Sequence, residues 1–416
     1  MDNAGLFLRE CLNPPAQVSE RGYFLEARVT AGLSERGRTL EVKRTPLGKA
    51  SNILVSAEAT HGGRVYEAAR RLGIAPEEVI DFSANINPMG PPSGVLAAIE
   101  KYLAPVNLRS YPDAHPFVSA LAEKHGVEPG EIVIGPGSAA LMFATMRALL
   151  PATALVLEPC FDEYFRACAA VGAEVTRMRL RKEDGFAPDF GALALIVEAR
   201  QRNLLILNSP HNPTGRLYVK EDLMALLDVA EANEVTVLLD EAFIDYAPQS
   251  SLIHVAATTS RLIVLRSLTK FYAIPGLRVG YAVCSSDMAA TIRRQFDVWP
   301  VSMIALEAGR AALTEEEYER ESRRVNAQAR EEFADALSEI GLSVFPSEAN
   351  FLLARLPYGS GAELAGWLES SRILIRTCDS FSGLGDAYIR LAVRSNEDNL
   401  RLVSLVETWL RRSAKE

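Results

Sequence analysis

Short apolar segments alternate with helical patterns from Val65 onward, and this alternation constrains the fold of the 416-residue chain more than any other feature. Strands that are apolar at consecutive positions are buried on both faces, as in parallel sheets covered by helices on each side. The predicted strands are Ile132–Ile134, Ala154–Leu157, Val175–Met178, Leu204–Leu207, Val235–Leu239, Leu262–Leu265 and Val279–Val283. The predicted helices between them are Ser138–Leu150, Phe161–Val171, Phe190–Ala199 and Lys220–Ala232. The pattern therefore predicts an α/β fold with a mostly parallel sheet.

The pattern changes after Pro300. A long helix-prone stretch, Glu315–Ile340, leads to shorter predicted elements, and together they indicate a smaller C-terminal α+β domain. Those elements are the strands Phe351–Ala354, Ile373–Arg376 and Tyr388–Val393 and the closing helix Glu397–Arg411. At the other end, residues 1–58 have weak helical periodicity and nearly balanced charges, so we expect a flexible extension there.

Composition excludes several classes of function. The 44 Lys and Arg residues against 53 Asp and Glu give a net charge of −9, which disfavours a general nucleic-acid binder. No apolar segment approaches the roughly 18 residues of a membrane span. The five cysteines are scattered without a CxxC pair, and no His, Cys, Asp or Glu spacing indicates a metal site. We expect a cytoplasmic protein without metal, membrane or nucleic-acid partners.

Two short motifs suggest other enzymes. Gly135-Pro-Gly137-Ser-Ala-Ala140 resembles a dinucleotide-binding turn, but such a turn suits any phosphate at a helix N-terminus. Ser267-Leu-Thr-Lys270 matches the S-x-x-K of penicillin-recognising enzymes, but the S-D-N and K-T-G elements of those enzymes are missing. Neither motif alone supports NAD binding or serine acyl transfer.

Three other segments agree with one another, and each follows a predicted strand. They are Asn208-Ser-Pro-His-Asn212-Pro-Thr-Gly215, Asp240-Glu-Ala-Phe243, and Ser267-Leu-Thr-Lys270 with Gly276-Leu-Arg278-Val-Gly280. An amide, a buried acid and a lysine are the groups that pyridoxal phosphate (PLP) requires, because the lysine forms a Schiff base and the acid protonates the ring nitrogen. The candidate phosphate ligands are Gly137, Ser138, Ala139, Ser267, Thr269 and Arg278.

These segments together resemble the class I/II aminotransferases, the fold type I PLP enzymes, over about residues 59–416. The resemblance implies that Lys270 is the Schiff-base lysine, Asp240 the pyridinium partner and Asn212 the partner of the phenolic oxygen. It implies that Phe161 stacks on the cofactor ring and that Tyr111 reaches the phosphate of a neighbouring subunit, so a homodimer with shared active sites is expected.

The resemblance also implies a domain division. Residues 59–108 form an N-terminal arm and small-domain segment, 109–300 a large PLP-binding domain with a seven-stranded sheet, and 301–416 a small C-terminal domain. One departure concerns Phe243, where many relatives have a tyrosine whose hydroxyl helps to hold the phenolic oxygen.

The N-terminal motifs point to one branch of the family. Thr60-His61-Gly62-Gly63, followed by Asp81-Phe-Ser-Ala-Asn85-Ile-Asn-Pro, is similar to the L-threonine-O-3-phosphate decarboxylases of cobalamin biosynthesis. By that resemblance Arg390 binds the substrate carboxylate, with Asn85 and Asn212 nearby. His61 and Arg376 face the substrate phosphate. The expected product is (R)-1-amino-2-propanol O-2-phosphate.

Bond orientation explains why such contacts matter. PLP weakens whichever Cα bond stands perpendicular to its ring, so anchoring the phosphate and the carboxylate at two points can select decarboxylation over transamination. A histidinol-phosphate aminotransferase is the main alternative. A PLP-binding DNA regulator is a third, but residues 1–58 are too short and too evenly charged to form the basic DNA-binding domain of such proteins.

Overall fold

The computed structural model describes residues 23–30, 39–46, 61–199 and 203–414. The α-helices are α2 (Val65–Leu72), α3 (Ser93–Tyr102), α4 (Pro105–Leu108), α5 (His115–His125), α6 (Ser138–Leu149), α7 (Glu163–Ala170), α8 (Phe190–Glu198), α9 (Lys220–Ala232), α10 (Ile253–Thr258), α11 (Ser286–Arg293), α12 (Met303–Ala312), α13 (Glu316–Glu339), α14 (Gly361–Glu369) and α15 (Asn396–Ser413). The strands are β1 (Tyr23–Thr30), β2 (Thr39–Pro46), β3 (Ile80–Asp81), β4 (Ile132–Gly135), β5 (Thr153–Glu158), β6 (Glu174–Arg179), β7 (Leu204–Asn208), β8 (Thr236–Asp240), β9 (Leu262–Ser267), β10 (Gly280–Val283), β11 (Ser343–Val344), β12 (Phe351–Arg355), β13 (Ile373–Leu374), β14 (Arg376–Thr377) and β15 (Tyr388–Ala392).

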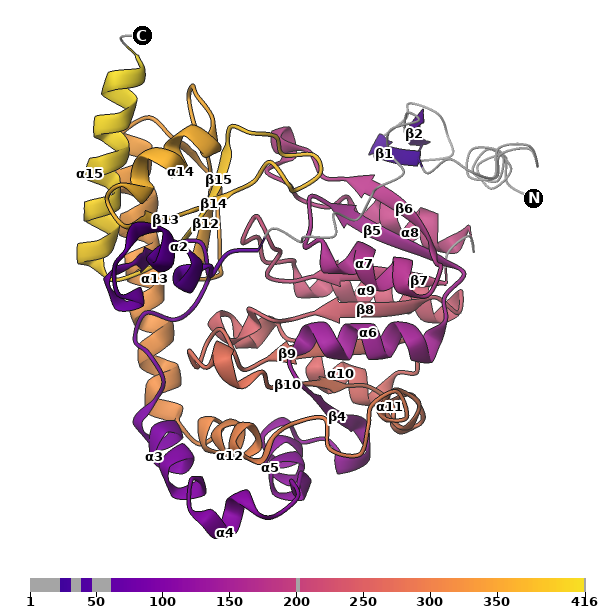
Figure 1. The fold of residues 1–416 in the computed structure, drawn as a ribbon. Coiled ribbons are helices and arrows are strands. Elements are labelled where there is room, and N and C mark those ends of the chain that lie inside the picture. The colour runs from indigo at the N-terminus through magenta and orange to yellow at the C-terminus, as the bar shows by residue number, and fades with distance from the viewer. Residues whose placement is uncertain (1–22, 31–38, 47–60, 200–202, 415–416) are drawn as a thin grey trace.

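The large sheet has the order β2-β1-β6-β5-β7-β8-β9-β10-β4 (Figure 1). The neighbours from β6 to β9 pair in parallel, and β10 runs antiparallel to both β9 and β4. The seven strands from β6 to β4 confirm the predicted mostly parallel sheet between helices. Strands β1 and β2 add an antiparallel pair beyond β6.

Apolar cores cover both faces of this sheet, because successive side chains of a strand point to opposite faces. In β5, Leu155 and Leu157 belong to one core, whereas Ala154 and Val156 belong to the other. The first core includes side chains of α5, α8, α9, α10 and α12, and the second includes side chains of α6, α7 and α11. Burial on both faces explains the continuous apolar runs in the sequence.

A second unit follows α12. Its sheet has the order β11-β12-β15-β14, and its core joins side chains of α13, α14 and α15 to Phe82 from the N-terminal part of the chain. The prediction of one strand at Ile373–Arg376 is wrong. Ile373 and Leu374 pair in parallel with β3, whereas Arg376 and Thr377 pair with β15. The chain changes sheet at Ile375, and an apolar pattern does not reveal a change of partner.

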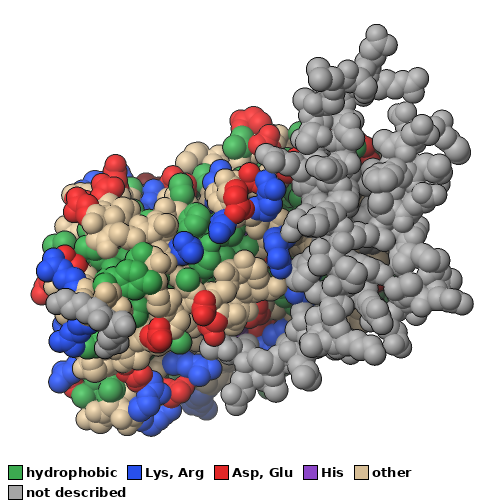
Figure 2. All heavy atoms as spheres, turned by 90° about the horizontal axis from the view of Figure 1, so that it is seen from above, with side chains coloured by type: hydrophobic (Ala, Val, Ile, Leu, Met, Phe, Trp, Pro, Cys, Tyr) green, Lys and Arg blue, Asp and Glu red, His purple; other side chains and the backbone are tan. Residues whose placement is uncertain are grey.

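Strands β1 and β2 lie within the stretch 1–58 that the sequence predicts to be a flexible extension, and the rest of that stretch lies outside the described residues. Within the described part of the chain, no helix has the length and apolar character needed to cross a bilayer. No cluster of three or more metal-ligating side chains occurs among these residues either. Figure 2 shows acidic and basic side chains interspersed over the described surface of one face.

Candidate functional site

The site lies where parallel strands of the large sheet end. Asn208 and Asp240 are the last residues of β7 and β8 and stand opposite each other in register. Ser267 ends β9 and pairs with Gly280 of β10, which also pairs with Gly135 at the end of β4. Three strands therefore deliver polar side chains to one edge, beside the glycines of β10 and β4, where open α/β sheets place their ligands.

A cavity at this edge brings together most of the residues singled out in the sequence. Those that line it are His61, Asn85, Ser138, Ala139, Phe161, Asn212, Asp240, Ser267, Thr269, Lys270, Arg278, Arg376 and Arg390. Gly137 directly precedes Ser138 but does not line the cavity. Tyr111 lies elsewhere, 74% exposed and stacked on Trp299 with ring centroids 4.0 Å apart.

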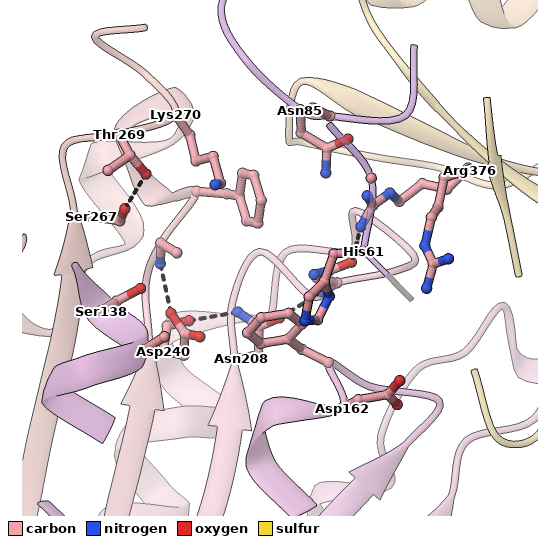
Figure 3. A pocket seen from close by; sticks show the side chains of 18 of the residues that line it. His61, Asn85, Ser138, Asp162, Asn208, Asp240, Ser267, Thr269, Lys270 and Arg376 are labelled. Carbon is pink, nitrogen blue, oxygen red and sulfur yellow. Dashed lines mark hydrogen bonds between the residues drawn. The ribbon is translucent and has the colours of Figure 1, made fainter. Parts of the chain in front are cut away.

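Lys270 lies three residues beyond the end of β9 and points into the cavity (Figure 3). Burial lowers the pKa of its amine to about 8, and the positive charges of Arg278 and Arg390 add to this effect. Asp240 opposes it. A neutral amine is the nucleophilic form, so the surroundings prepare Lys270 to attack a carbonyl carbon near neutral pH.

Asp240 is held in place from two sides. Tyr164 donates a hydrogen bond to its Oδ2 (2.8 Å), and the Ala242 backbone amide donates to its Oδ1 (3.0 Å). Burial raises the pKa of this carboxyl, while the two hydrogen bonds and the charge of Lys270 act against that rise. The result is an oriented acid that can share a proton with a ring nitrogen.

Two asparagines organise the next loop. Asn208 donates from Nδ2 to the Asp240 carbonyl (2.7 Å) and accepts at Oδ1 from the Asn212 amide (2.6 Å). The Asn212 Oδ1 in turn accepts a hydrogen bond from Arg390 (2.6 Å). A chain of hydrogen bonds therefore runs from the Asp240 backbone carbonyl through Asn208 and Asn212 to the guanidinium of Arg390.

A cradle of donors lies at the start of α6. Gly137 has φ = 89°, and a Cβ there would come within 2.7 Å of the Arg278 guanidinium, so this close approach requires glycine. Ser267 and Thr269 share a hydroxyl hydrogen bond of 2.8 Å beside it. Arg278 has no ion pair with any carboxylate in the described ranges. The cradle, the amine and the oriented acid fit an aromatic aldehyde that carries a phosphate and a ring nitrogen.

Arg376 and Arg390 are cross-strand neighbours on β14 and β15. Both are buried, and burial lowers the pKa of each, that of Arg390 to about 10. Arg390 binds Asn212 and the Ser83 carbonyl, and Arg376 binds the Ser380 hydroxyl, but neither meets a carboxylate among the residues described. Two like charges directly opposite each other are unfavourable unless an anion joins them.

The His61-Gly-Gly segment is fixed against Ser83. A Cβ at Gly62 would lie 2.1 Å from the Ser83 carbonyl oxygen, and the Gly63 amide donates to the Ser83 hydroxyl (2.8 Å). His61 is 3.1 Å from Glu163 through its Nε2. Near it, Asn85 is 4% exposed and its Oδ1 has no hydrogen-bond partner among residues 61–199 and 203–414, as expected for a group that binds a ligand.

Sequence reasoning assigned no role to four polar residues of the site. Asn208 and Asp162 line the cavity, Tyr164 holds Asp240, and Glu163 holds His61. Tyr164 follows Phe161 by three residues at the start of a helix. This spacing places both side chains on one face, and it is the sequence signal that could have assigned Tyr164 to the site. Phe243 lines the cavity and packs edge-on against Phe351 at 5.0 Å, so this ring offers no hydroxyl to a ligand.

Comparisons with known proteins identify the family and several relatives. A family model described as aminotransferase class I and II matches residues 77–406. A threonine-phosphate decarboxylase of Salmonella typhimurium is 39% identical over 359 residues, 85% of this chain and 97% of that protein. A histidinol-phosphate aminotransferase of Pseudomonas aeruginosa is 32% identical over 350 residues, 82% of this chain and 92% of its own length. The crystal structure of the histidinol-phosphate aminotransferase from Clostridium acetobutylicum matches with a TM-score of 0.74 and 30% identity, over 79% of this chain and 99% of that one.

Proposed function

Because the chain belongs to the aminotransferase class I and II family, whose members depend on PLP, we propose that it is a PLP-dependent decarboxylase of L-threonine O-3-phosphate. The product is (R)-1-amino-2-propanol O-2-phosphate, an intermediate of cobalamin biosynthesis. The observation that carries this proposal is the pair Arg376 and Arg390 at the cavity that holds Lys270, two buried cations with no carboxylate partner in the described part of the chain. The 39% identity to a threonine-phosphate decarboxylase supports it.

The residues divide the binding task between two ends of the cavity. We call Lys270, Asp240, Asn208, Ser267, Thr269 and Arg278 the lysine end, and Arg376, Arg390, His61, Asn85 and Asp162 the arginine end. The lysine end would hold PLP, with Asp240 at the ring nitrogen, Asn212 at the phenolic oxygen and Phe161 against the ring. Gly137, Ser138, Ala139, Ser267, Thr269 and Arg278 would surround its phosphate.

The arginine end would hold the substrate. When bound, PLP supplies an electron sink for the pair of electrons released at the substrate Cα. Arg390 and Asn85 would grip the α-carboxylate, and Arg376 and His61 the phosphate, so the substrate is fixed at two points. Two-point attachment limits rotation about the Cα–N bond and can keep the carboxylate out of the ring plane. Lys270 would carry the proton that replaces the lost carboxylate at Cα.

We further propose a cytoplasmic homodimer with shared active sites. Tyr111 is exposed, stacks on Trp299 and does not line the cavity of its own chain, which leaves its hydroxyl available to the cofactor phosphate of a second subunit. Light scattering should give twice the chain mass. A monomer that keeps full activity would contradict this part of the proposal.

The experiment is incubation of the purified PLP-loaded enzyme with O-phospho-L-threonine, with and without 2-oxoglutarate. We expect release of carbon dioxide and an amine of the product mass in both samples. Histidinol-phosphate aminotransferase is the second candidate, because a relative of that activity is 32% identical. Glutamate formation from histidinol phosphate and 2-oxoglutarate, without carbon dioxide release from phosphothreonine, would favour that candidate.

A further inference from the structure

Asp162 lines the cavity together with Arg376 and His61, and none of the roles proposed above uses it. Figure 3 shows these three side chains on one side of the cavity, away from Lys270. Asp162 directly precedes α7, but its side chain accepts no capping hydrogen bond from that helix. An acidic group at an end built to bind an anion therefore calls for a functional explanation.

The charged groups around Asp162 come from several elements. Arg376 of β14, His61 before α2 and Arg177 of β6 favour the ionised carboxylate, whereas Glu163 of α7 disfavours it. Burial is the largest influence, and it raises the pKa of Asp162.

Most of these neighbours are already engaged with other groups. Glu163 is held by His61 (3.1 Å) and Arg166 (2.5 Å), and Arg177 is held by Glu158 (2.6 Å). Arg376 donates a hydrogen bond to Ser380 (2.7 Å) and lies 5.1 Å from the centroid of the Phe381 ring, but it has no ion pair with a described carboxylate. Arg376 is therefore the cation that Asp162 and an incoming anion would share.

A phosphate monoester at Arg376 would bring a second negative group close to Asp162. The second pKa of such a phosphate is about 6, so the free ligand is mainly a dianion above neutral pH. Two anionic oxygens in contact favour uptake of a proton, because one charge is then removed and a short O–H···O bond forms.

We propose that Asp162 is a specificity-determining residue through which the site binds a phosphate monoester together with one proton from solvent. The proton lies between the Asp162 carboxyl and a phosphate oxygen. This inference rests on the proposed function, because it assumes that the group bound by Arg376 and His61 is a phosphate. It also implies that the affinity for phosphorylated ligands falls as the pH rises.

The test is the inhibition constant of isopropyl phosphate, a monoester with neither amine nor carboxylate, measured against phosphothreonine decarboxylation from pH 6.5 to 9. In the unmodified holoenzyme the constant should rise about tenfold per pH unit above pH 7, because one proton is taken up on binding. In Asp162→Asn the inhibition constant should change less than about twofold between pH 6.5 and 9. At pH 9 it should be at least about tenfold lower than in the unmodified enzyme.

Asp379→Asn is the matched control. Asp379 is exposed and does not line the cavity, and its negative charge raises the pKa of Arg376. The pH dependence of the inhibition constant should therefore persist in that variant. His61→Asn removes the imidazole that lines the cavity beside Asp162. It should weaken inhibition at every pH and keep the slope.

Three results would overturn the inference. One is an inhibition constant that does not change with pH in the unmodified enzyme, although that enzyme decarboxylates phosphothreonine. Another is a slope that persists in Asp162→Asn, in which case Asp162 only positions Arg376. A third is a slope that disappears in His61→Asn, which would place the proton on the imidazole. Absence of phosphothreonine decarboxylation would instead overturn the proposed function.

Discussion

At the lysine end of the cavity, neighbours hold most polar side chains, whereas at the arginine end two buried polar atoms have no hydrogen-bond partner among the described residues. Asp240 accepts two hydrogen bonds, and Ser267 and Thr269 bond each other. In contrast, Asn85 Oδ1 and Arg390 Nε are buried and accept or donate no hydrogen bond within the part of the chain that the structure describes. The comparison indicates that the lysine end is preorganised for a permanently bound group. The polar atoms of the arginine end find their partners only when an exchanging ligand binds.

Loss of the amine should have the largest effect. We expect Lys270→Ala to lower kcat/KM for phosphothreonine at least about 10⁴-fold, because no second lysine of the described residues lines the cavity to replace it as nucleophile and proton carrier. The assay is carbon dioxide release. Lys182→Ala removes an exposed lysine and should retain full activity. Substantial activity in Lys270→Ala would contradict the assignment of the lysine end.

Asp240→Asn should be the next most damaging change. The amide cannot carry the negative charge that stabilises a protonated ring nitrogen, so kcat should fall about 10²- to 10³-fold with little change in KM. Asp287→Asn, on the exposed start of α11, is the control. A change confined to KM would show that Asp240 only helps binding.

Arg376→Ala should impair binding of the substrate phosphate at the arginine end without affecting the lysine end. We expect kcat/KM for phosphothreonine to fall about 10²-fold, mainly through KM, because a charge-assisted contact to the phosphate is lost. Turnover of unphosphorylated threonine, already poor, should not fall further. Arg355→Ala, an exposed arginine at the end of β12, serves as the control. Equal losses for both substrates would break the distinction between the ends.

The low pKa of Lys270 predicts a pH dependence. In the cofactor-free protein the amine is neutral above about pH 8. Only the neutral form attacks an aldehyde, so the rate of PLP capture should rise about tenfold per pH unit below pH 8 and level off above it. Stopped-flow absorbance measures this rate. A rise that continues to pH 10 would show that the surroundings do not lower the pKa of Lys270.

Tyr164→Phe should have the smallest effect of these changes. It removes the hydrogen bond to Asp240 Oδ2 and leaves the ring, so kcat should fall about tenfold. Tyr66→Phe changes an exposed tyrosine and should have no effect. A loss as large as that of Asp240→Asn would instead assign Tyr164 a direct contact with the cofactor or substrate.

The sequence predicted the large sheet well because burial on both faces leaves a clear apolar signature. Ser138–Leu150 and Lys220–Ala232, for example, match α6 and α9 to within one residue. The break at Ile375 could not be predicted, because partner choice depends on distant β3 and β15. Asp240, Asn212 and Lys270 stand out because loops rich in Pro and Gly follow buried strands. Asp162 and Glu163 do not stand out, since two acids at a helix start also stabilise the helix.

The most direct test of the account is the chemical identity of the bond between the protein and its cofactor. The PLP-loaded protein is reduced with borohydride, digested and mapped by mass spectrometry. We predict a phosphopyridoxyl group on the peptide that contains Lys270, and its loss in Lys270→Ala. A labelled lysine at another position, or no label at all in a protein that has been saturated with PLP, would contradict the central claim.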